Sequence, residues 1–90
     1  MLQVFISYSS KNRDYAFKIY DELTKVGVEC WMDARNICPG DQWDRAINQA
    51  LDNSTHMIYL HTQDARDSDN VWDQWSYFRN RRKPVIPVIL

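Results

Sequence analysis

The chain has 90 residues, with 11 Lys and Arg side chains against 12 Asp and Glu, and its formal net charge is −1. This length predicts one small domain, and the balanced charge argues against a general nucleic-acid binder, which needs a basic excess. A hydrophobic fraction of 44% excludes a disordered chain, and no apolar run approaches the ~20 residues of a membrane span.

The first part of the chain alternates strand and helix patterns. Residues 3–8 form a nearly continuous β-branched and aromatic run, typical of a buried parallel strand. Helix-capping residue types follow, and apolar residues then recur at helical spacing until Gly27, which we expect to end the helix as its C′ residue. Residues 28–32 predict a second strand, and residues 33–40 predict a loop that contains the turn Pro39-Gly40.

The middle of the chain repeats this alternation. Asp41 is expected to cap a second helix, with Asp44 in its first turn and an apolar face made by Trp43, Ala46, Ile47, Ala50 and Leu51. Residues 52–54 break this helix, and residues 57–60 predict a third strand.

The last part begins with a polar loop at residues 62–69. Asp67 or Ser68 would cap a third helix, whose apolar stripe comprises Val71, Trp72, Trp75 and Phe78. The basic residues 79–83 favour the C-terminal end of the helix dipole, Pro84 stops the helix, and residues 85–90 predict a fourth strand. Because the chain ends inside an apolar strand, we expect a fragment or a domain that continues in a longer protein.

The order β-α-β-α-β-α-β predicts an α/β fold, a flavodoxin-like doubly wound parallel sheet with strand order 2-1-3-4. Residues 1–90 form its single domain. Ligands of such sheets bind beyond the carboxyl ends of the strands. We therefore expect a crevice lined by residues 8–12, 33–40 and 62–70.

Several familiar sites are excluded. The only glycines are Gly27 and Gly40, so neither a dinucleotide-binding glycine motif nor a P-loop is present. Ser9-Ser10 and His61-Thr62 stand where a response-regulator receiver needs acids, and no nucleophile elbow occurs. The two cysteines, Cys30 and Cys38, are interpreted as reduced thiols of a cytoplasmic protein rather than as a disulfide bridge.

Segments in the same order along the chain resemble the TIR (Toll/interleukin-1 receptor) domain family, in its bacterial style. They are VFISYS at residues 4–9, CWMD at 30–33, PGD at 39–41, SDNVWDQW at 68–75 and KPVIPV at 83–88. The family fold has a fifth strand and further helices, so the resemblance implies that this chain is truncated before the fifth strand.

The resemblance implies one of two functions. Some TIR domains hydrolyse NAD to nicotinamide and ADP-ribose or a cyclic variant, here in bacterial antiviral immunity, and others are non-enzymatic scaffolds. Both kinds assemble through the BB loop, which is Ile37, Cys38, Pro39 and Gly40 here. The implied partners are NAD as substrate, other TIR domains, and a fused or associated sensor or effector domain, with no cofactor, metal, nucleic acid or membrane. A generic flavodoxin-like nucleotide binder without turnover is a third alternative.

The family places a catalytic Glu on the third helix, six positions after a Ser. Read from Ser68, that pattern arrives at Gln74. A carboxylate there would stabilise oxocarbenium charge as the nicotinamide–ribose bond breaks. Gln keeps an acceptor oxygen but has no charge and cannot act as a base, so we expect a catalytically impaired chain. We favour a deliberate replacement that traps NAD over a natural loss of activity or an ordinary solvated Gln.

Further NAD contacts are implied by the resemblance, and each has a simpler alternative. The simpler role of the residues at the end of the first strand is to terminate that strand and cap the next helix. Arg35 could be a solvated loop residue, and Trp43 is favoured as part of the helix core. Asn70 stands where family members often have Trp. The candidate residues are Ser7, Tyr8, Ser9, Lys11, Trp31, Asp33, Arg35, Asn36, Trp43, Ser68 and Asn70.

Overall fold

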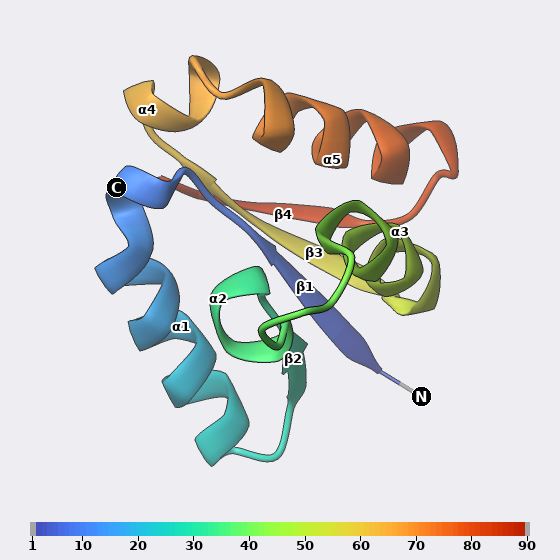
Figure 1. Cartoon of the computed structure of the whole chain (residues 1–90). Helices are drawn as coiled ribbons and strands as arrows, with labels where there is room; N and C mark the ends of the chain where they lie inside the picture. Colours follow the sequence, from blue (N-terminus) through green and yellow to red (C-terminus); the bar gives the residue numbers. More distant parts are fainter. Residues whose placement is uncertain (1, 90) are drawn as a thin grey trace.

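A computed structural model describes residues 2–89 and shows four parallel strands with helices between them (Figure 1). The sheet order is β2-β1-β3-β4, which confirms the predicted doubly wound topology. The predicted strand end at Leu90 lies outside the described residues. The elements are β1 (Gln3–Ser7), η1 (Ser10–Asn12), α1 (Arg13–Lys25), β2 (Glu29–Trp31), α2 (Asp33–Asn36), α3 (Trp43–Asn53), β3 (His56–His61), α4 (Gln63–Arg66), α5 (Asp69–Asn80) and β4 (Val85–Ile89).

The core has two layers, one on each face of the sheet. Side chains alternate across a strand, so Val4 and Ile6 of β1 belong to one apolar cluster and Phe5 belongs to the other. The first cluster includes Ala16 of α1, and the second includes Leu51 of α3 and Phe78 of α5. Helix α1 thus covers one face, whereas α3 and α5 cover the opposite face.

Two positive-φ glycines mark the turns that the sequence predicted. Gly27 has φ 88° and follows α1, where its N–H bonds to the carbonyl of Thr24 and the Val28 N–H bonds to Leu23. Gly40 has φ 93°, and the Asp41 N–H closes its turn on the Cys38 carbonyl. Both conformations are strained for residues with a Cβ atom, which explains glycine at these two positions.

The predicted loops at residues 33–40 and 62–69 each contain a short helix that the sequence did not predict. These are α2, which begins directly after β2, and α4, which Thr62 caps by accepting the Ala65 N–H at 3.0 Å. The prediction that Asp41 caps α3 was also wrong, because the N-cap is Gln42. Asp41 Oδ2 instead accepts the Cys38 N–H at 2.9 Å, since aspartate bonds readily to the backbone of its own turn.

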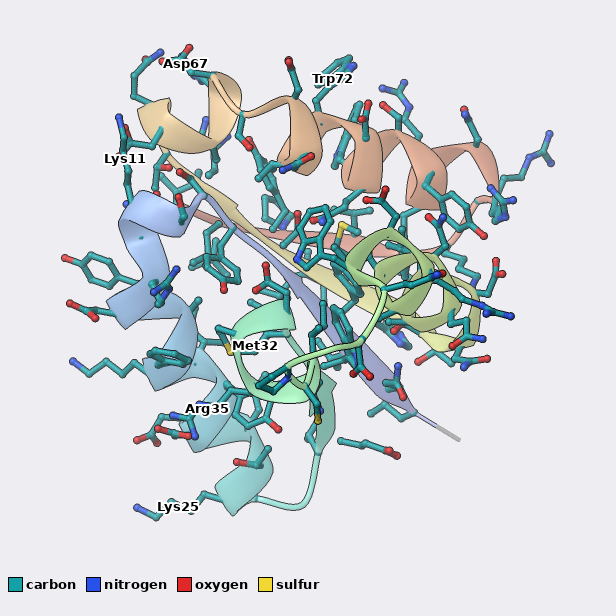
Figure 2. All side chains as sticks on the ribbon, in the orientation of Figure 1. Lys11, Lys25, Met32, Arg35, Asp67 and Trp72 are labelled. Atoms are coloured by element: carbon teal, nitrogen blue, oxygen red, sulfur yellow. The ribbon has the colours of Figure 1, made fainter. Side chains whose placement is uncertain are left out.

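Two tryptophans predicted on apolar helix faces lie at the surface. Trp43 is 42% exposed and Trp72 is 62% exposed, and Trp72 points away from the sheet (Figure 2). Val71 and Phe78 fill the buried side of α5, and residue 72 is turned about 100° from residue 71. Trp72 therefore packs on Trp75 at a centroid distance of 5.1 Å instead of entering the core.

Strand β4 is an outer strand of the sheet in the described residues, and some of its apolar residues are exposed. Ile86 is 48% exposed and Ile89 is 79% exposed, in line with the apolar edge expected from the sequence. Pro87 stands in the middle of this strand, opposite Tyr59 of β3. Within residues 2–89, no helix is both long and apolar enough to cross a membrane.

Lys83 has a different role from the one predicted. It was assigned to the dipole at the end of α5, but its Nζ donates to the carbonyls of Leu51, Asp52 and Ser54 at 3.1, 2.9 and 2.9 Å. These carbonyls belong to the C-terminal end of α3, where helical partners run out. The ammonium group thus joins the end of α3 to the segment that leads into β4.

We expect Lys83→Met to lower the free energy of unfolding by about 1–3 kcal/mol, because three carbonyls lose a charged donor. The measurement is urea denaturation followed by circular dichroism. Lys18→Met, an exposed change on α1, is the matched control and should stay within about 0.5 kcal/mol of the parent. Equal losses in the two variants would contradict the capping role.

Candidate functional site

A cleft of about 380 Å³ opens beyond the carboxyl ends of β1 and β2, where parallel sheets bind ligands. All three segments that the sequence predicted for the crevice contribute to it, and Arg13 of α1, Trp43 of α3 and Gln74 of α5 are added. Eleven residues line it, namely Tyr8, Ser9, Ser10, Arg13, Asp33, Ala34, Ile37, Trp43, Ser68, Asn70 and Gln74.

A larger hollow of about 490 Å³ lies between the pair α4–α5 and the pair β3–β4. Its walls are mostly apolar, and it adjoins the open edge of the sheet through Val85 and Pro87. The smaller cleft holds the hydroxyl, amide and charged side chains that can orient a polar ligand. We therefore place the candidate site in the cleft at the ends of β1 and β2.

Gln74 is fixed at the junction of β1 and α5. The hydroxyl of Ser7, which is fully buried, donates to Gln74 Oε1 at 2.7 Å. This contact and the partial burial of Gln74 contradict the alternative of an ordinary solvated residue. Within residues 2–89 the Nε2 group of Gln74 donates no hydrogen bond, so it remains available to a ligand.

Tyr8 and Asp33 form a polar pair in the same cleft. The Tyr8 hydroxyl donates to Asp33 Oδ1, and the Ala34 N–H donates to the same oxygen at 2.7 Å. Burial raises the pKa of the Tyr8 phenol well above its usual range, and the hydrogen bond to Asp33 adds to this effect. Tyr8 therefore stays a donor at any physiological pH and orients the Asp33 carboxylate.

Ser9 and Ser68 each combine a place in the cleft wall with a capping role. The Ser9 Oγ accepts the Lys11 N–H at 3.4 Å, and the Ser68 Oγ accepts the Val71 N–H at 3.4 Å. Ser68 is the N-cap of α5, which confirms one of the two caps predicted for that helix. These hydroxyls keep donor protons for a ligand while they accept from the backbone.

Arg13 lines the cleft but was not among the residues selected from the sequence. No carboxylate of residues 2–89 lies within 4.0 Å of its guanidinium, which leaves the charge free for an anion. A signal was present in the sequence. Arg13 opens α1, and a cation in the first turn opposes the helix dipole, so a role outside the helix could have been suspected.

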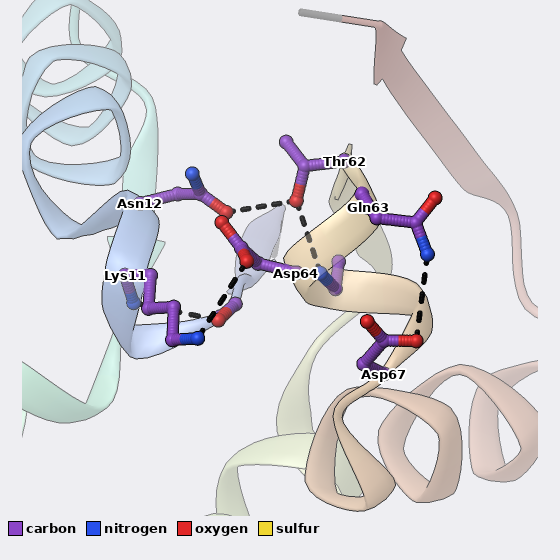
Figure 3. Close-up of polar contacts among 8 residues, drawn as sticks. Lys11, Asn12, Thr62, Gln63, Asp64 and Asp67 are labelled. Carbon is purple, nitrogen blue, oxygen red and sulfur yellow. Dashed lines mark hydrogen bonds and ion pairs between the residues drawn. The ribbon is translucent and has the colours of Figure 1, made fainter.

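Lys11 and Asn36 do not line the cleft. Figure 3 shows Lys11 turned toward Asp64, with Nζ and Oδ1 3.9 Å apart, beside the bond from Thr62 to Asn12. The Asn36 Oδ1 accepts the Met32 N–H at 3.0 Å and so fixes the turn into α2. The contact of either residue with NAD stays a prediction.

Arg35 and Trp31 also have partners inside the fold. Arg35 lies against α1, 4.5 Å above the Phe17 ring and 3.3 Å from the Asp21 carboxylate (Figure 2). Trp31 stacks on Phe5 at a centroid distance of 5.1 Å, although it borders a small crevice that Asp33 and Gln74 also line. Their assigned contacts with NAD are untested as well.

A second hollow of about 310 Å³ continues the cleft between α3 and α5. Trp43, Asn70 and Gln74 line both spaces, and Asp44 and Asp73 enter only the second one. Trp43, placed in the core by the favoured sequence interpretation, is thus an exposed wall of the site. Gln74 stands where the two spaces meet.

The loop assigned to self-assembly turns outward from the cleft. Ile37 forms part of the cleft wall, whereas Cys38, Pro39 and Gly40 are exposed. Both Cys30 and Cys38 are free thiols, as the sequence interpretation held. No cluster of three His, Cys, Asp or Glu side chains that could hold a metal ion occurs between residues 2 and 89.

The Tyr8–Asp33 pair predicts an alkaline effect on stability. The folded phenol has a raised pKa, whereas the unfolded one titrates near its usual value of about 10, so the unfolded chain loses this proton first as pH rises. The contribution of the Tyr8 phenol to the free energy of unfolding is therefore fully present below about pH 10 and should decrease as the pH rises above that value. Tyr8→Phe should lose less stability than the parent between about pH 9 and about pH 11 in urea unfolding. Tyr15→Phe, an exposed change, should follow the parent, and a parallel pH slope in Tyr8→Phe would refute this reading.

Comparison with known proteins identifies related folds. The chain is similar to the TIR domain of the Toll-related receptor TRR-2 from Hydra magnipapillata, with a TM-score of 0.81 and 20% identity over 93% of this chain and 66% of that one. It is also similar to the TIR domains of the activated Roq1 resistosome, which recognises the pathogen effector XopQ. Here the TM-score is 0.84 and the identity 16%, over 99% of this chain and 57% of that one. A third similar structure is a metazoan TIR-STING receptor from C. gigas, with a TM-score of 0.77 and 22% identity over 97% of this chain and 30% of that one.

These likenesses establish the fold, and the chain spans less than two thirds of the length of each matched structure. No curated protein matches the chain significantly by sequence. The family model described as a TIR domain matches residues 4–90, almost the whole chain. The chain therefore belongs to the TIR domain family.

Proposed function

We propose that this chain is a bacterial-type TIR NAD hydrolase domain of antiviral immune signalling, which is active after self-assembly and whose catalysis is impaired by Gln74. The observation that carries the proposal is the Ser7–Gln74 hydrogen bond, which fixes residue 74 in a cleft that also contains Tyr8, Asp33 and Trp43. An NAD-binding role agrees with this mixture of hydroxyl, charged and aromatic groups.

The proposed reaction converts NAD⁺ and water to nicotinamide, ADP-ribose and a proton. The bond between nicotinamide and ribose breaks with its electron pair leaving on the ring nitrogen, and positive charge develops on the ribose. A carboxylate at position 74 would stabilise that charge and bind a ribose hydroxyl. The Ser7 hydroxyl, 2.7 Å from residue 74, would donate to such a carboxylate and hold it in its ionised form.

A non-enzymatic scaffold is the second candidate, and one observation favours it. Position 74 lacks a charge, while the loop residues Cys38, Pro39 and Gly40 are exposed and free to contact another copy. Related folds are found in a resistosome and in a TIR-STING receptor, which supports partners of the TIR kind and a fused or associated sensor for this domain.

The reversion Gln74→Glu separates the two candidates. In the assembled protein it should raise nicotinamide release from NAD at least about 100-fold, the usual contribution of one transition-state charge contact. Adding Ser7→Ala should then reduce the rate roughly tenfold, because the new carboxylate loses its buried donor. Asp73→Glu, which puts a Glu on the neighbouring position of α5, is the control and should stay inactive. An inactive Gln74→Glu protein that still assembles would refute the hydrolase proposal.

Self-assembly is tested at the exposed loop. Pro39→His should lower the weight-average mass in light scattering to that of a monomer, because it disturbs the turn that presents this loop. Lys25→His, an exposed change at the far end of α1, should leave assembly intact. Unchanged assembly in Pro39→His would remove residues 37–40 from the interface.

A further inference from the structure

The charges that line the candidate cleft are few and specific. Within residues 2–89, Asp33 is the only carboxylate that lines the cleft, and Arg13 is the only cation. With Gln74 in place, no second negative charge enters this space. Asp44 and Asp73 line only the adjoining hollow, so Asp33 is the carboxylate placed to act most directly on a cationic ligand group in the cleft.

One carboxylate oxygen of Asp33 accepts hydrogen bonds within the fold, and the other is available to a ligand. Oδ1 accepts both the Tyr8 hydroxyl and the Ala34 N–H. In the described part of the chain, Oδ2 accepts no hydrogen bond. The two donors on Oδ1 restrict the rotation of the carboxylate, so Oδ2 is an oriented acceptor beside the cleft.

Asp33 also lies close to the position that the proposed reaction uses. Asp33, Tyr8 and Gln74 all line the cleft of about 380 Å³, and they also border a narrow crevice of about 10 Å³. The open Oδ2 of Asp33 and the unpaired Nε2 of Gln74 thus present an acceptor and a donor to the same region. A ribose hydroxyl can accept from Gln74 Nε2, and an adjoining cationic ring suits the Asp33 carboxylate.

We propose that Asp33 is a specificity-determining residue that makes this cleft prefer the oxidised, cationic nicotinamide dinucleotide over its reduced, neutral form. This inference rests on the proposed NAD function and deepens it. The oxidised ring carries one positive charge that the dihydropyridine lacks, and Asp33 is the group that distinguishes them. Arg13 takes the diphosphate, which both forms share, and therefore contributes affinity without this discrimination.

The test measures binding at equilibrium, because the proposed function expects Gln74 to suppress turnover. Isothermal titration calorimetry with NAD⁺, NADH and ADP-ribose gives three affinities for each variant. The parent should bind NAD⁺ roughly five- to tenfold more tightly than NADH, the scale of one partly exposed charge pair. Asp33→Asn, whose amide oxygen still accepts from Tyr8, should reduce that ratio to about one while the NADH and ADP-ribose affinities hold.

Two further variants sharpen the result. Asp73→Asn removes a carboxylate from the adjoining hollow and should keep the NAD⁺ preference. Arg13→Gln should weaken all three ligands by a similar factor. A preference that survives Asp33→Asn, or that disappears in Asp73→Asn, would overturn the role of Asp33.

The same titrations distinguish this inference from the proposed function. Binding of NAD⁺ and NADH with equal affinity in the parent would overturn the Asp33 inference and leave the NAD site intact. Failure of all three ligands to bind would count against the NAD function itself, and the inference would fall with it.

Discussion

The central strand β1 is buried on both faces, and the rest of the structure is organised around that constraint. Its residues Val4 and Ile6 face the layer of α1, and Phe5 faces the layer of α3 and α5. Ser7 comes next in this alternation and therefore points toward α5 as well, with its hydroxyl removed from water. A buried hydroxyl without a partner would be costly, and Gln74 Oε1 satisfies it. The position that matters for the proposed chemistry is thus set by the packing of the core.

This arrangement explains why the site is spread over four segments of the chain. Tyr8 follows β1, Asp33 follows β2, Trp43 begins α3 and Gln74 lies on α5. Parallel strands bring their carboxyl ends to one edge of the sheet, so residues far apart in sequence meet there. The short helix α2 then lets the Ala34 N–H reach the Asp33 carboxylate. Local backbone geometry and global topology together orient the acidic group.

Sequence patterns predicted the features that depend on burial and on backbone conformation. The positive φ of Gly27 and the Ser68 cap follow from rules that act within a few residues. The strand order follows from the alternation of strands and helices along the chain and from the right-handed crossovers between parallel strands. The misses depend on tertiary context. The spacing of Trp72 places it in an apolar stripe, but α5 packs on the sheet with one side only, and Trp72 lies outside that side. Lys83 bonds to the end of a helix that lies about thirty residues earlier in the chain. For Arg13 the sequence held a signal, a cation in the first turn of α1, but its place in the cleft depends on how α1 leaves the sheet.

The proline in β4 has a consequence for the open edge of the sheet. The Pro84 carbonyl accepts the Met57 N–H, so residues 84, 86 and 88 direct their backbone groups toward β3. Residues 85, 87 and 89 then direct theirs outward, and the central one of the three is Pro87, which has no N–H. Any strand added along this edge would meet a carbonyl without its neighbouring donor and would forfeit one bond of the ladder. Pro87 thereby restricts which strand can pair along this side of β4, where Ile86 and Ile89 are exposed in the described part of the chain.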